Sequence, residues 1–203
     1  MANAVERFGP TRRGGPVFRW LGESLAIDLA NTVMVIDGDD SLDLLSSAED
    51  LRDWLSRERP RLGEGGFAVS HLDEVRELRD AVRELLAAAV EGRAPQPRAL
   101  ERVNAASVAA PVAPQLEVGA EGHLEPGDPL ESGAALARLL GALARSAIEL
   151  LSGPERERLR VCTAPSCGMF FVGARRWCCS ACGNRARVAR HYRRTRSSKP
   201  ASH

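Results

Sequence analysis

Cysteine is concentrated near the C-terminal end of this sequence of 203 residues. The chain has five cysteines in all, and they stand at Cys162, Cys167, Cys178, Cys179 and Cys182. Two close groups separated by a loop of ten residues let four thiolates surround one Zn²⁺ ion at tetrahedral positions. We therefore expect one structural zinc ion. The spacing alone leaves the third ligand open between Cys178 and Cys179.

Two other uses of these cysteines are disfavoured. A disulfide framework would need an even number of cysteines and an oxidising compartment. A catalytic zinc usually recruits histidine or a carboxylate and keeps one position open, whereas no histidine, aspartate or glutamate lies between Cys162 and Cys182. The residues therefore favour a closed, structural site.

The charge of the chain is divided sharply at the same point. Residues 1–157 carry 17 arginines against 27 acids, a net of −10, and residues 158–203 carry ten arginines and one lysine with no acid, a net of +11. Arginine forks bind phosphates and the edges of guanine bases, so the basic segment predicts contact with nucleic acid. A solvated tail that covers the acidic body is the alternative. The candidate contacts are Arg185, Arg187, Arg190, Arg193, Arg194 and Arg196.

Short elements must hold the cysteines in place. Apolar residues predict two short strands, "RLRVC" and "GMFFV", with the first pair of cysteines on the turn between them. A helix is expected from Gly183 onward, so that the fourth ligand starts the element that carries the arginines. Because so small a unit buries little apolar surface, the metal must supply much of its stability.

The remaining chain predicts a mainly helical body. Ser24 is expected to cap a buried helix that runs through Met34, followed by a loop over residues 37–45. Asp28, Asn31 and Thr32 are polar residues in that helix; they either hydrogen-bond a neighbouring segment or line a small-molecule pocket. A helix is expected over residues 47–60, with a Ser47–Asp50 capping box and a stop at Pro60, and another over 70–92 with Ser70 as its cap. Two more helices are expected over 98–110 and 130–153. Between them, residues 114–129 predict a β-hairpin.

The cysteine segment resembles the CGNR zinc finger of bacteria, named for a tetrapeptide that stands here as Cys182, Gly183, Asn184 and Arg185. The resemblance implies that the zinc ligands are Cys162, Cys167, Cys178 and Cys182, and that Cys179 is a spare thiol. The segments "LAIDLANTV", "LRDWL" and "VRELRDAVRELL" resemble the ABATE domain that precedes this finger in a family of stress-induced transcription regulators. The motif "LDxxNT" of that family stands here as "IDLANT", and the resemblance therefore points to Asp28, Asn31 and Thr32 as pocket residues.

Together these observations predict an α+β protein with a helical N-terminal domain and a zinc finger of knuckle, hairpin and helix. The expected divisions are a flexible arm over 1–15, the ABATE-like domain over 16–153, the finger over 154–197 and a tail over 198–203. We expect a cytoplasmic, non-enzymatic regulator that binds DNA, acts as a homodimer or with a partner, and responds to a small-molecule effector. No apolar run approaches the length of about 20 residues that a membrane span needs. An RNA- or protein-binding finger, and an enzyme built around Asp28, are the alternatives.

Overall fold

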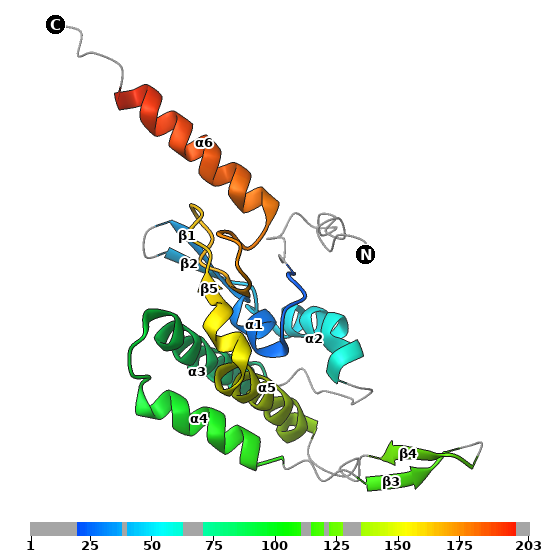
Figure 1. The fold of residues 1–203 in the computed structure, drawn as a ribbon. Coiled ribbons are helices and arrows are strands. Elements are labelled where there is room, and N and C mark those ends of the chain that lie inside the picture. Colours follow the sequence, from blue (N-terminus) through cyan, green and yellow to red (C-terminus); the bar gives the residue numbers. More distant parts are fainter. Residues whose placement is uncertain are drawn as a thin grey trace, which may run out of the picture.

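The computed structural model of the chain describes residues 20–37, 40–62, 71–110, 115–119, 122–127 and 135–197. The expected arm over 1–15 and tail over 198–203 lie outside these residues. Figure 1 shows the order and arrangement of the elements. They are α1 (Leu25–Ala30), β1 (Val33–Asp37), β2 (Asp40–Asp43), α2 (Ala48–Leu62), α3 (Leu72–Glu91), α4 (Pro97–Val108), β3 (Gln115–Val118), β4 (Leu124–Gly127), α5 (Ala135–Ser152), the 3₁₀ helix η3 (Pro154–Arg158), β5 (Leu159–Val161), β6 (Phe170–Val172) and α6 (Ser180–Ser197).

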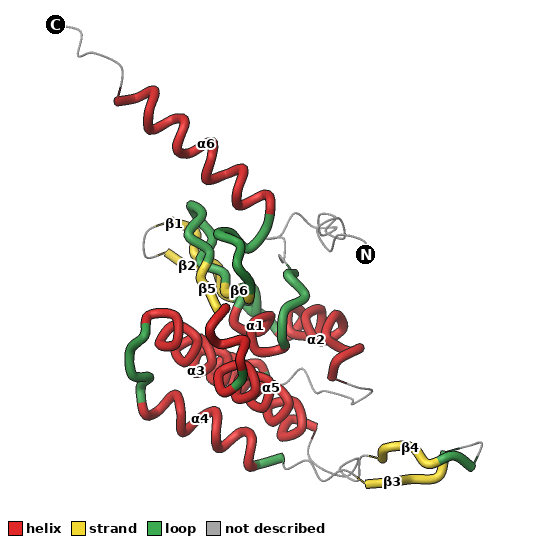
Figure 2. Tube along the Cα trace, in the orientation of Figure 1, coloured by secondary structure: helices red, strands yellow, loops and turns green. Residues whose placement is uncertain are grey.

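The hydrophobic core lies between α1, α3, α4 and α5, with α2 against its edge (Figure 2). Leucines recur at helical spacing along α3 and α5, so each helix turns one apolar face inward. The short helix α1 is the centre of this packing, because every residue from Ala26 to Ala30 is buried. Leu159 of β5 and Phe170 of β6 belong to the same core. The C-terminal segment is therefore packed into the helical body and shares its core.

Two sequence expectations around α1 are wrong. The helix is capped by Ser24, whose hydroxyl accepts a hydrogen bond from Ile27 N at 3.4 Å, but it ends at Ala30 and does not reach Met34. Asn31 is its C-cap, and the chain continues as strand β1. The segment expected as a loop holds strand β2, which pairs antiparallel with β1. Val33, Val35 and Ile36 are β-branched, and this favours an extended backbone over a helical one.

The other elements agree more closely with the expectations from the sequence. The Ser47–Asp50 capping box of α2 is confirmed, with Ser47 N donating to Asp50 Oδ2 at 2.8 Å and Asp50 N donating to Ser47 Oγ at 3.2 Å. The stop at Pro60 is wrong, because α2 continues to Leu62 with Pro60 inside its last turn. Helix α3 has His71 at its N-cap position, and the expected cap Ser70 lies outside the described residues. The hairpin β3–β4 is confirmed.

The fold is thus α+β and mostly helical, with three small antiparallel hairpins among the described residues and a cysteine cluster that leads into a C-terminal helix. Figure 1 places α6 at one end of the molecule and the hairpin β3–β4 at the other. Among the described helices, none has the length and apolar character that a membrane span requires.

Candidate metal centre and nucleic-acid interface

The β5–β6 hairpin carries the first pair of cysteines on its turn. Cys162 directly follows β5, and its backbone N–H donates to Met169 O at 2.8 Å, which closes the turn. Cys167 is flanked by Ser166 and Gly168, both with positive φ, at 54° and 66°. Glycine adopts this conformation without strain, and there is no room for a side chain at Gly168 because a Cβ would lie 2.6 Å from Val35 Cγ2. The turn therefore folds both sulfurs toward the same point.

The second pair comes from the start of α6. This helix begins at Ser180, three residues earlier than the sequence suggested, so that Cys182 lies in its first turn and Cys178 just before it. A Cβ at Gly183 would lie 3.2 Å from the Trp177 ring, which is tighter than most Cβ contacts, so glycine lets the helix pack closely against the indole. The family tetrapeptide thus includes one zinc ligand and one close-packing position.

The four sulfurs of Cys162, Cys167, Cys178 and Cys182 lie within 4.8 Å of one another, and all four residues are buried. The Sγ atom of Cys178 is 3.6 Å from that of Cys167 and 3.4 Å from that of Cys182, and Cys182 is 3.6 Å from Cys167. Four thiolates bound to one Zn²⁺ ion at about 2.3 Å stand about 3.8 Å apart at the corners of a tetrahedron. The residues fit the metal, and they form the site of one structural zinc ion.

The electrostatics of the cluster also call for a cation. Hydrogen bonds from the thiols of Cys167, Cys178 and Cys182 hold the pKa of the Cys162 thiol far below its usual range. The pKa of Cys178 is raised far above it, because its thiol donates to neighbouring sulfurs and would ionise beside them. Four buried thiols therefore cannot all become thiolates unless a positive ion joins them. A zinc ion supplies that charge.

Cys179 lies outside this cluster. It is half-buried, and its Sγ atom is 4.0 Å from that of Cys178. It is the one cysteine whose sulfur is not grouped with the other four. Since the four grouped sulfurs already complete a tetrahedral set, the site has no need of Cys179.

Arg185 does not extend toward solvent as Arg187, Arg190, Arg193 and Arg194 do. Its Nη2 atom donates to Cys182 Sγ at 3.1 Å, and the side chain is half-buried. Four thiolates and one Zn²⁺ carry a net charge of about −2, so a guanidinium beside them offsets part of the excess. The predicted role of Arg185 in nucleic-acid contact has no support in this placement. Its position assigns it to the metal centre.

We expect Arg185→Ala to weaken zinc retention by about 10- to 100-fold, the usual effect of removing a group that hydrogen-bonds a metal ligand. Competition with a chromogenic chelator measures this. Arg187→Ala, two residues further along the same helix and exposed, is the matched control and should retain zinc like the wild type. Equal retention in both variants would remove Arg185 from the metal centre.

Asn31 joins the helical body to the zinc hairpin. Its Oδ1 atom accepts from Phe170 N at 2.8 Å, and its Nδ2 donates to Phe170 O at 3.0 Å. Nearby, Val35 N of β1 donates to the carbonyl oxygen of the ligand Cys167 at 3.3 Å. Asn31 is 4% exposed, so both bonds are shielded from water. Asn31 therefore ties the end of α1 to the start of β6, three residues beyond the ligand Cys167.

Asp28 and Thr32, the other motif residues, also have protein partners. Asp28 Oδ2 accepts from Arg61 Nη2 at 2.7 Å, and Thr32 Oγ1 donates to Leu29 O at 2.7 Å. Both side chains are buried. All three motif side chains therefore form hydrogen bonds inside the fold. The expected small-molecule pocket at Asp28, Asn31 and Thr32 stays a prediction.

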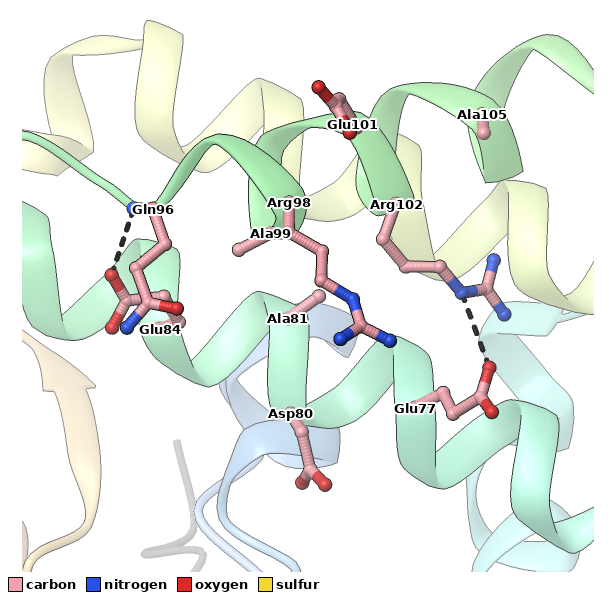
Figure 3. Close-up of a pocket in the computed structure, with 10 residues that line it drawn as sticks. All are labelled: Glu77, Asp80, Ala81, Glu84, Gln96, Arg98, Ala99, Glu101, Arg102 and Ala105. Atoms are coloured by element: carbon pink, nitrogen blue, oxygen red, sulfur yellow. Dashed lines mark hydrogen bonds and ion pairs between the residues drawn. The ribbon is translucent and has the colours of Figure 1, made fainter.

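A cavity of about 550 Å³ lies elsewhere, between α3 and α4 (Figure 3). Its acids are largely paired within the protein: Glu77 Oε2 is 3.8 Å from Arg102 Nε, and Glu84 Oε1 accepts from Gln96 N at 3.1 Å. The remaining charged lining residues are Asp80, Arg98 and Glu101. None of the three motif residues lines this cavity.

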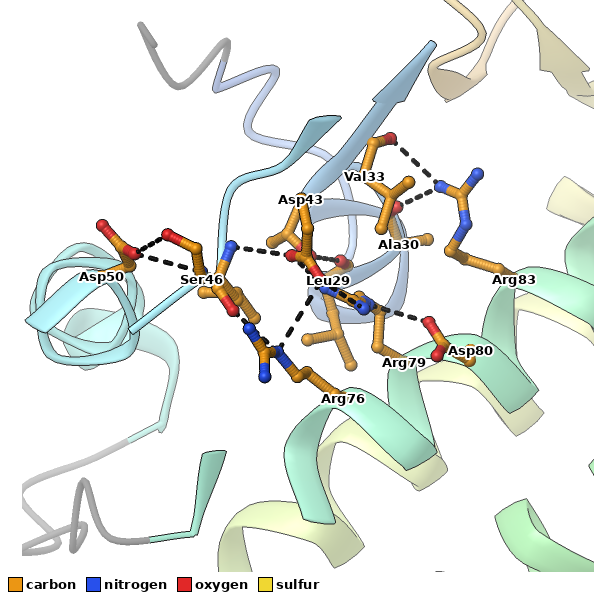
Figure 4. A network of polar contacts seen from close by, with 12 residues as sticks. Leu29, Ala30, Val33, Asp43, Ser46, Asp50, Arg76, Arg79, Asp80 and Arg83 are labelled. Atoms are coloured by element: carbon orange, nitrogen blue, oxygen red, sulfur yellow. Dashed lines mark hydrogen bonds and ion pairs between the residues drawn. The ribbon is translucent and has the colours of Figure 1, made fainter. Parts of the chain in front are cut away.

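Two arginines of α3 fasten the first hairpin to the body (Figure 4). Arg79 is 3% exposed and binds both oxygens of Asp43, at 2.6 and 2.9 Å. Burial acts to raise the pKa of Asp43, but the hydrogen bonds from Arg79 and from Leu45 N, together with the positive charges of Arg79 and Arg76, outweigh it and leave the pKa below its usual value. Arg83 donates to the carbonyls of Ala30 and Val33, where α1 ends and β1 begins. Sequence reasoning missed both, although Arg79 interrupts the apolar spacing of Val75 and Val82.

Glu58 of α2 is a fully buried acid, and sequence reasoning missed it as well. Its carboxyl lies against the guanidinium of Arg61, which also binds Asp28. Burial is the largest influence on both acids and outweighs Arg61; it raises the pKa of Glu58 to about 8 and that of Asp28 to about 6. Glu58 therefore holds a proton at neutral pH. The sequence did hold a signal for its burial, because Glu58 follows Trp54 and Leu55 at helical spacing and so falls on the apolar face of α2.

We expect the free energy of unfolding to depend on pH through Glu58. The folded state keeps the proton up to about pH 8, whereas the unfolded chain releases it near pH 4.5. The stabilisation that comes from the proton on the buried Glu58 carboxyl is at most about 4–5 kcal/mol. It is fully present below pH 4.5 and is lost as the pH rises to about 8. Glu58→Gln should be as stable as the wild type at pH 5 and more stable at pH 8 in zinc-saturated urea unfolding. The stabilisation that comes from the proton on Asp28 is lost in the same way between pH 3.8 and about 6, equally in the wild type and in Glu58→Gln. Parallel curves for the two would contradict the prediction.

The outer part of α6 carries the arginines into solvent. Arg187, Arg190 and Arg194 follow one another at spacings of three and four residues, so they share one face of the helix, and Arg193 lies beside them. All four are exposed. Arg196 also belongs to α6, but its side chain lies outside the described part of the structure. The zinc cluster holds the base of this helix, and the helix extends away from the body (Figure 1).

Fold and site together define a zinc-finger protein whose finger is packed against a helical N-terminal body. The chain matches the family model ABATE, "Putative stress-induced transcription regulator", over residues 23–154, and the CGNR zinc finger over residues 158–195. Since the first match covers more than half of the chain, the protein belongs to the ABATE family and carries a CGNR zinc finger. Neither is an enzyme family. A comparison with curated proteins gives no match.

Proposed function

We propose that this protein is a DNA-binding regulator in which the zinc-anchored helix α6 contacts the phosphate backbone and the grooves of DNA. The observation that carries the proposal is the exposed arginine face of α6, made of Arg187, Arg190, Arg193 and Arg194. No acid lies anywhere in residues 158–203 to weaken its attraction for a polyanion. The N-terminal body serves as the sensor or dimerisation module.

The zinc site supports this proposal mechanically. Helices in proteins gain most of their stability from packing, and the metal fixes the first turn of the 18-residue helix α6 through Cys182. The position and direction of the arginine face therefore depend on the metal. DNA affinity should follow zinc occupancy, because without the ion the arginines are no longer held on one rigid face.

The arginine face is tested by substitution. Replacing Arg190, Arg193 and Arg194 together with alanine should weaken duplex binding. The slope of log affinity against log salt should fall by about three, since each phosphate contact contributes about 0.9 to it. The matched control replaces Arg52, Arg98 and Arg156, which are exposed arginines of the body and η3. It removes the same charge and should leave the slope unchanged; equal slopes in the two triple variants would contradict the proposal.

The kind of nucleic acid is tested by competition. Labelled duplex DNA bound to the zinc-loaded protein is challenged with unlabelled duplex DNA or with structured RNA over a range of salt. An α-helix enters the major groove of B-form DNA but not the deep, narrow groove of A-form RNA. We expect DNA to compete more strongly. Stronger competition by RNA would favour an RNA-binding finger instead.

A further inference from the structure

Two elements at opposite ends of the molecule expose large apolar side chains (Figure 1). On the hairpin β3–β4, Leu116 and Val118 are each 72% exposed and Leu124 is 68% exposed. On α6, Val188 is 52% and Tyr192 65% exposed. We call the first group, Leu116, Val118 and Leu124, the hairpin face, and the second, Val188 and Tyr192, the helix stripe.

The hairpin face is a single surface. Leu116 and Val118 are two residues apart on β3 and so point to the same side, and Val118 pairs directly with Leu124 of β4. A hairpin of two strands is at best marginally stable in water unless its apolar side packs against something. The described part of the chain provides no such cover, because these three residues are largely exposed. A surface on another molecule can supply that cover.

The helix stripe is in the same situation. Val188 and Tyr192 are four residues apart and share one face of α6, on the side away from Arg187, Arg190 and Arg194. Beyond its first turn, α6 extends into solvent (Figure 2). A partner could therefore cover the stripe while the arginine face stays turned outward.

Charge selects which surfaces meet. From Val103 to Ala137 the sequence has five acids and no arginine or lysine, and from Arg158 onward it has eleven basic residues and no acid. Two hairpins or two α6 helices brought together would place like charges side by side. A hairpin against an α6 helix combines apolar contact with opposite net charge, which attracts the two elements at long range while Arg187, Arg190 and Arg194 point away from the contact. Because the two elements lie at opposite ends of one molecule, they must meet between different copies.

We propose that the protein forms a twofold dimer in which the hairpin face of each copy docks on the helix stripe of the other. Two elongated copies placed antiparallel bring each hairpin over the partner's α6, and the symmetry makes the contact twice. Each contact then needs to bury only about 500 Å² for the total to reach the roughly 1,000 Å² of a specific interface. The hairpin braces the helix from behind, so the dimer does not compete with DNA for the arginines.

Sedimentation velocity of the zinc-loaded full chain, without nucleic acid, tests the dimer. The wild type should be a dimer at tens of micromolar. Val118→Arg adds a positive charge to the hairpin, which then faces the basic helix of the partner copy. Val188→Glu adds a negative charge to α6, which then faces the acidic hairpin of the partner copy. Each variant alone should be monomeric. Mixed one to one they should form a heterodimer, because one contact then has complementary charges and the other is wild type.

The controls separate this result from loss of structure and from the proposed function. Both substituted valines are exposed, so zinc content and circular dichroism should match the wild type. Leu100→Glu changes an exposed leucine of α4 outside the interface and should leave the dimer intact. A monomeric wild type, a dimer that survives Val188→Glu, or a mixture that stays monomeric would each overturn the interface. None of these readings depends on whether the protein binds DNA.

Discussion

Replacing Cys178 with serine should abolish zinc binding and unfold the finger, whereas Cys179→Ser should bind one zinc ion per chain like the wild type. The sulfur of Cys178 lies among the four grouped thiols, and that of Cys179 does not. Structural zinc sites contribute about 10–16 kcal/mol in small fingers, which is more than the finger can recover from its own apolar contacts. Metal analysis of the purified proteins measures the difference.

The effect of Cys178→Ser should extend beyond the finger. Leu159 and Phe170 are 2% and 4% exposed and lie in the same core as α1, α3 and α5. When β5 and β6 lose their order, the helical body loses these two side chains from its packing. We expect its thermal unfolding to move to lower temperature, as followed by the helical circular dichroism signal. Zinc loss in Cys179→Ser with retention in Cys178→Ser would reverse the ligand assignment.

Asn31→Ala should destabilise the whole protein by about 2–5 kcal/mol. It leaves the buried N–H and C=O of Phe170 without partners, and each unsatisfied buried group costs about 1–3 kcal/mol. Urea unfolding at saturating zinc measures the change. The matched control is Asn104→Ala on α4, where the side chain is exposed and the loss should stay within about 0.5 kcal/mol.

Zinc affinity distinguishes two roles of Asn31: joining the helical body to the zinc hairpin, or only filling a position in the core of the body. If Asn31 holds the hairpin in place for the metal, Asn31→Ala should also release zinc to a chelator about tenfold more readily. A large loss of stability in Asn31→Ala with unchanged zinc affinity would show that Asn31 supports the body alone.

The zinc site and its helix could be predicted because their pattern is local, although spacing left the third ligand open and only the family resemblance selected Cys178 over Cys179. Pairs of cysteines on tight turns define a metal site with little help from the rest of the fold, and Cys182 at the start of α6 follows from spacing. Helix ends with a strong local signal, such as Ser24 and the Ser47–Asp50 capping box, were equally accessible.

The partners of the buried polar residues could not be predicted, because they come from distant parts of the chain. Asn31 binds Phe170, 139 residues away, and Arg79 binds Asp43 across 36 residues. The change from helix to strand after Ala30 depends on β2 and on Arg83, which are also supplied by the tertiary structure. For the same reason, the sequence divided the chain into body and finger, whereas packing joins them through Leu159 and Phe170.

This shared core gives the metal a role in the whole molecule. The zinc turn contacts β1 through Cys167 and Val35, and β6 is bound to α1 through Asn31. A change in the body can therefore reach the β5–β6 hairpin through two direct contacts, and the metal joins that hairpin to the base of α6.

The central claim is that zinc positions α6 for binding DNA. The most direct measurement is a zinc titration of the metal-free protein in the presence of a fluorescently labelled DNA duplex, followed by anisotropy at constant salt. We predict little binding at the start, a rise with added zinc, and saturation at one zinc ion per chain. Binding that is already complete without zinc, or that never develops when the site is filled, would contradict the account.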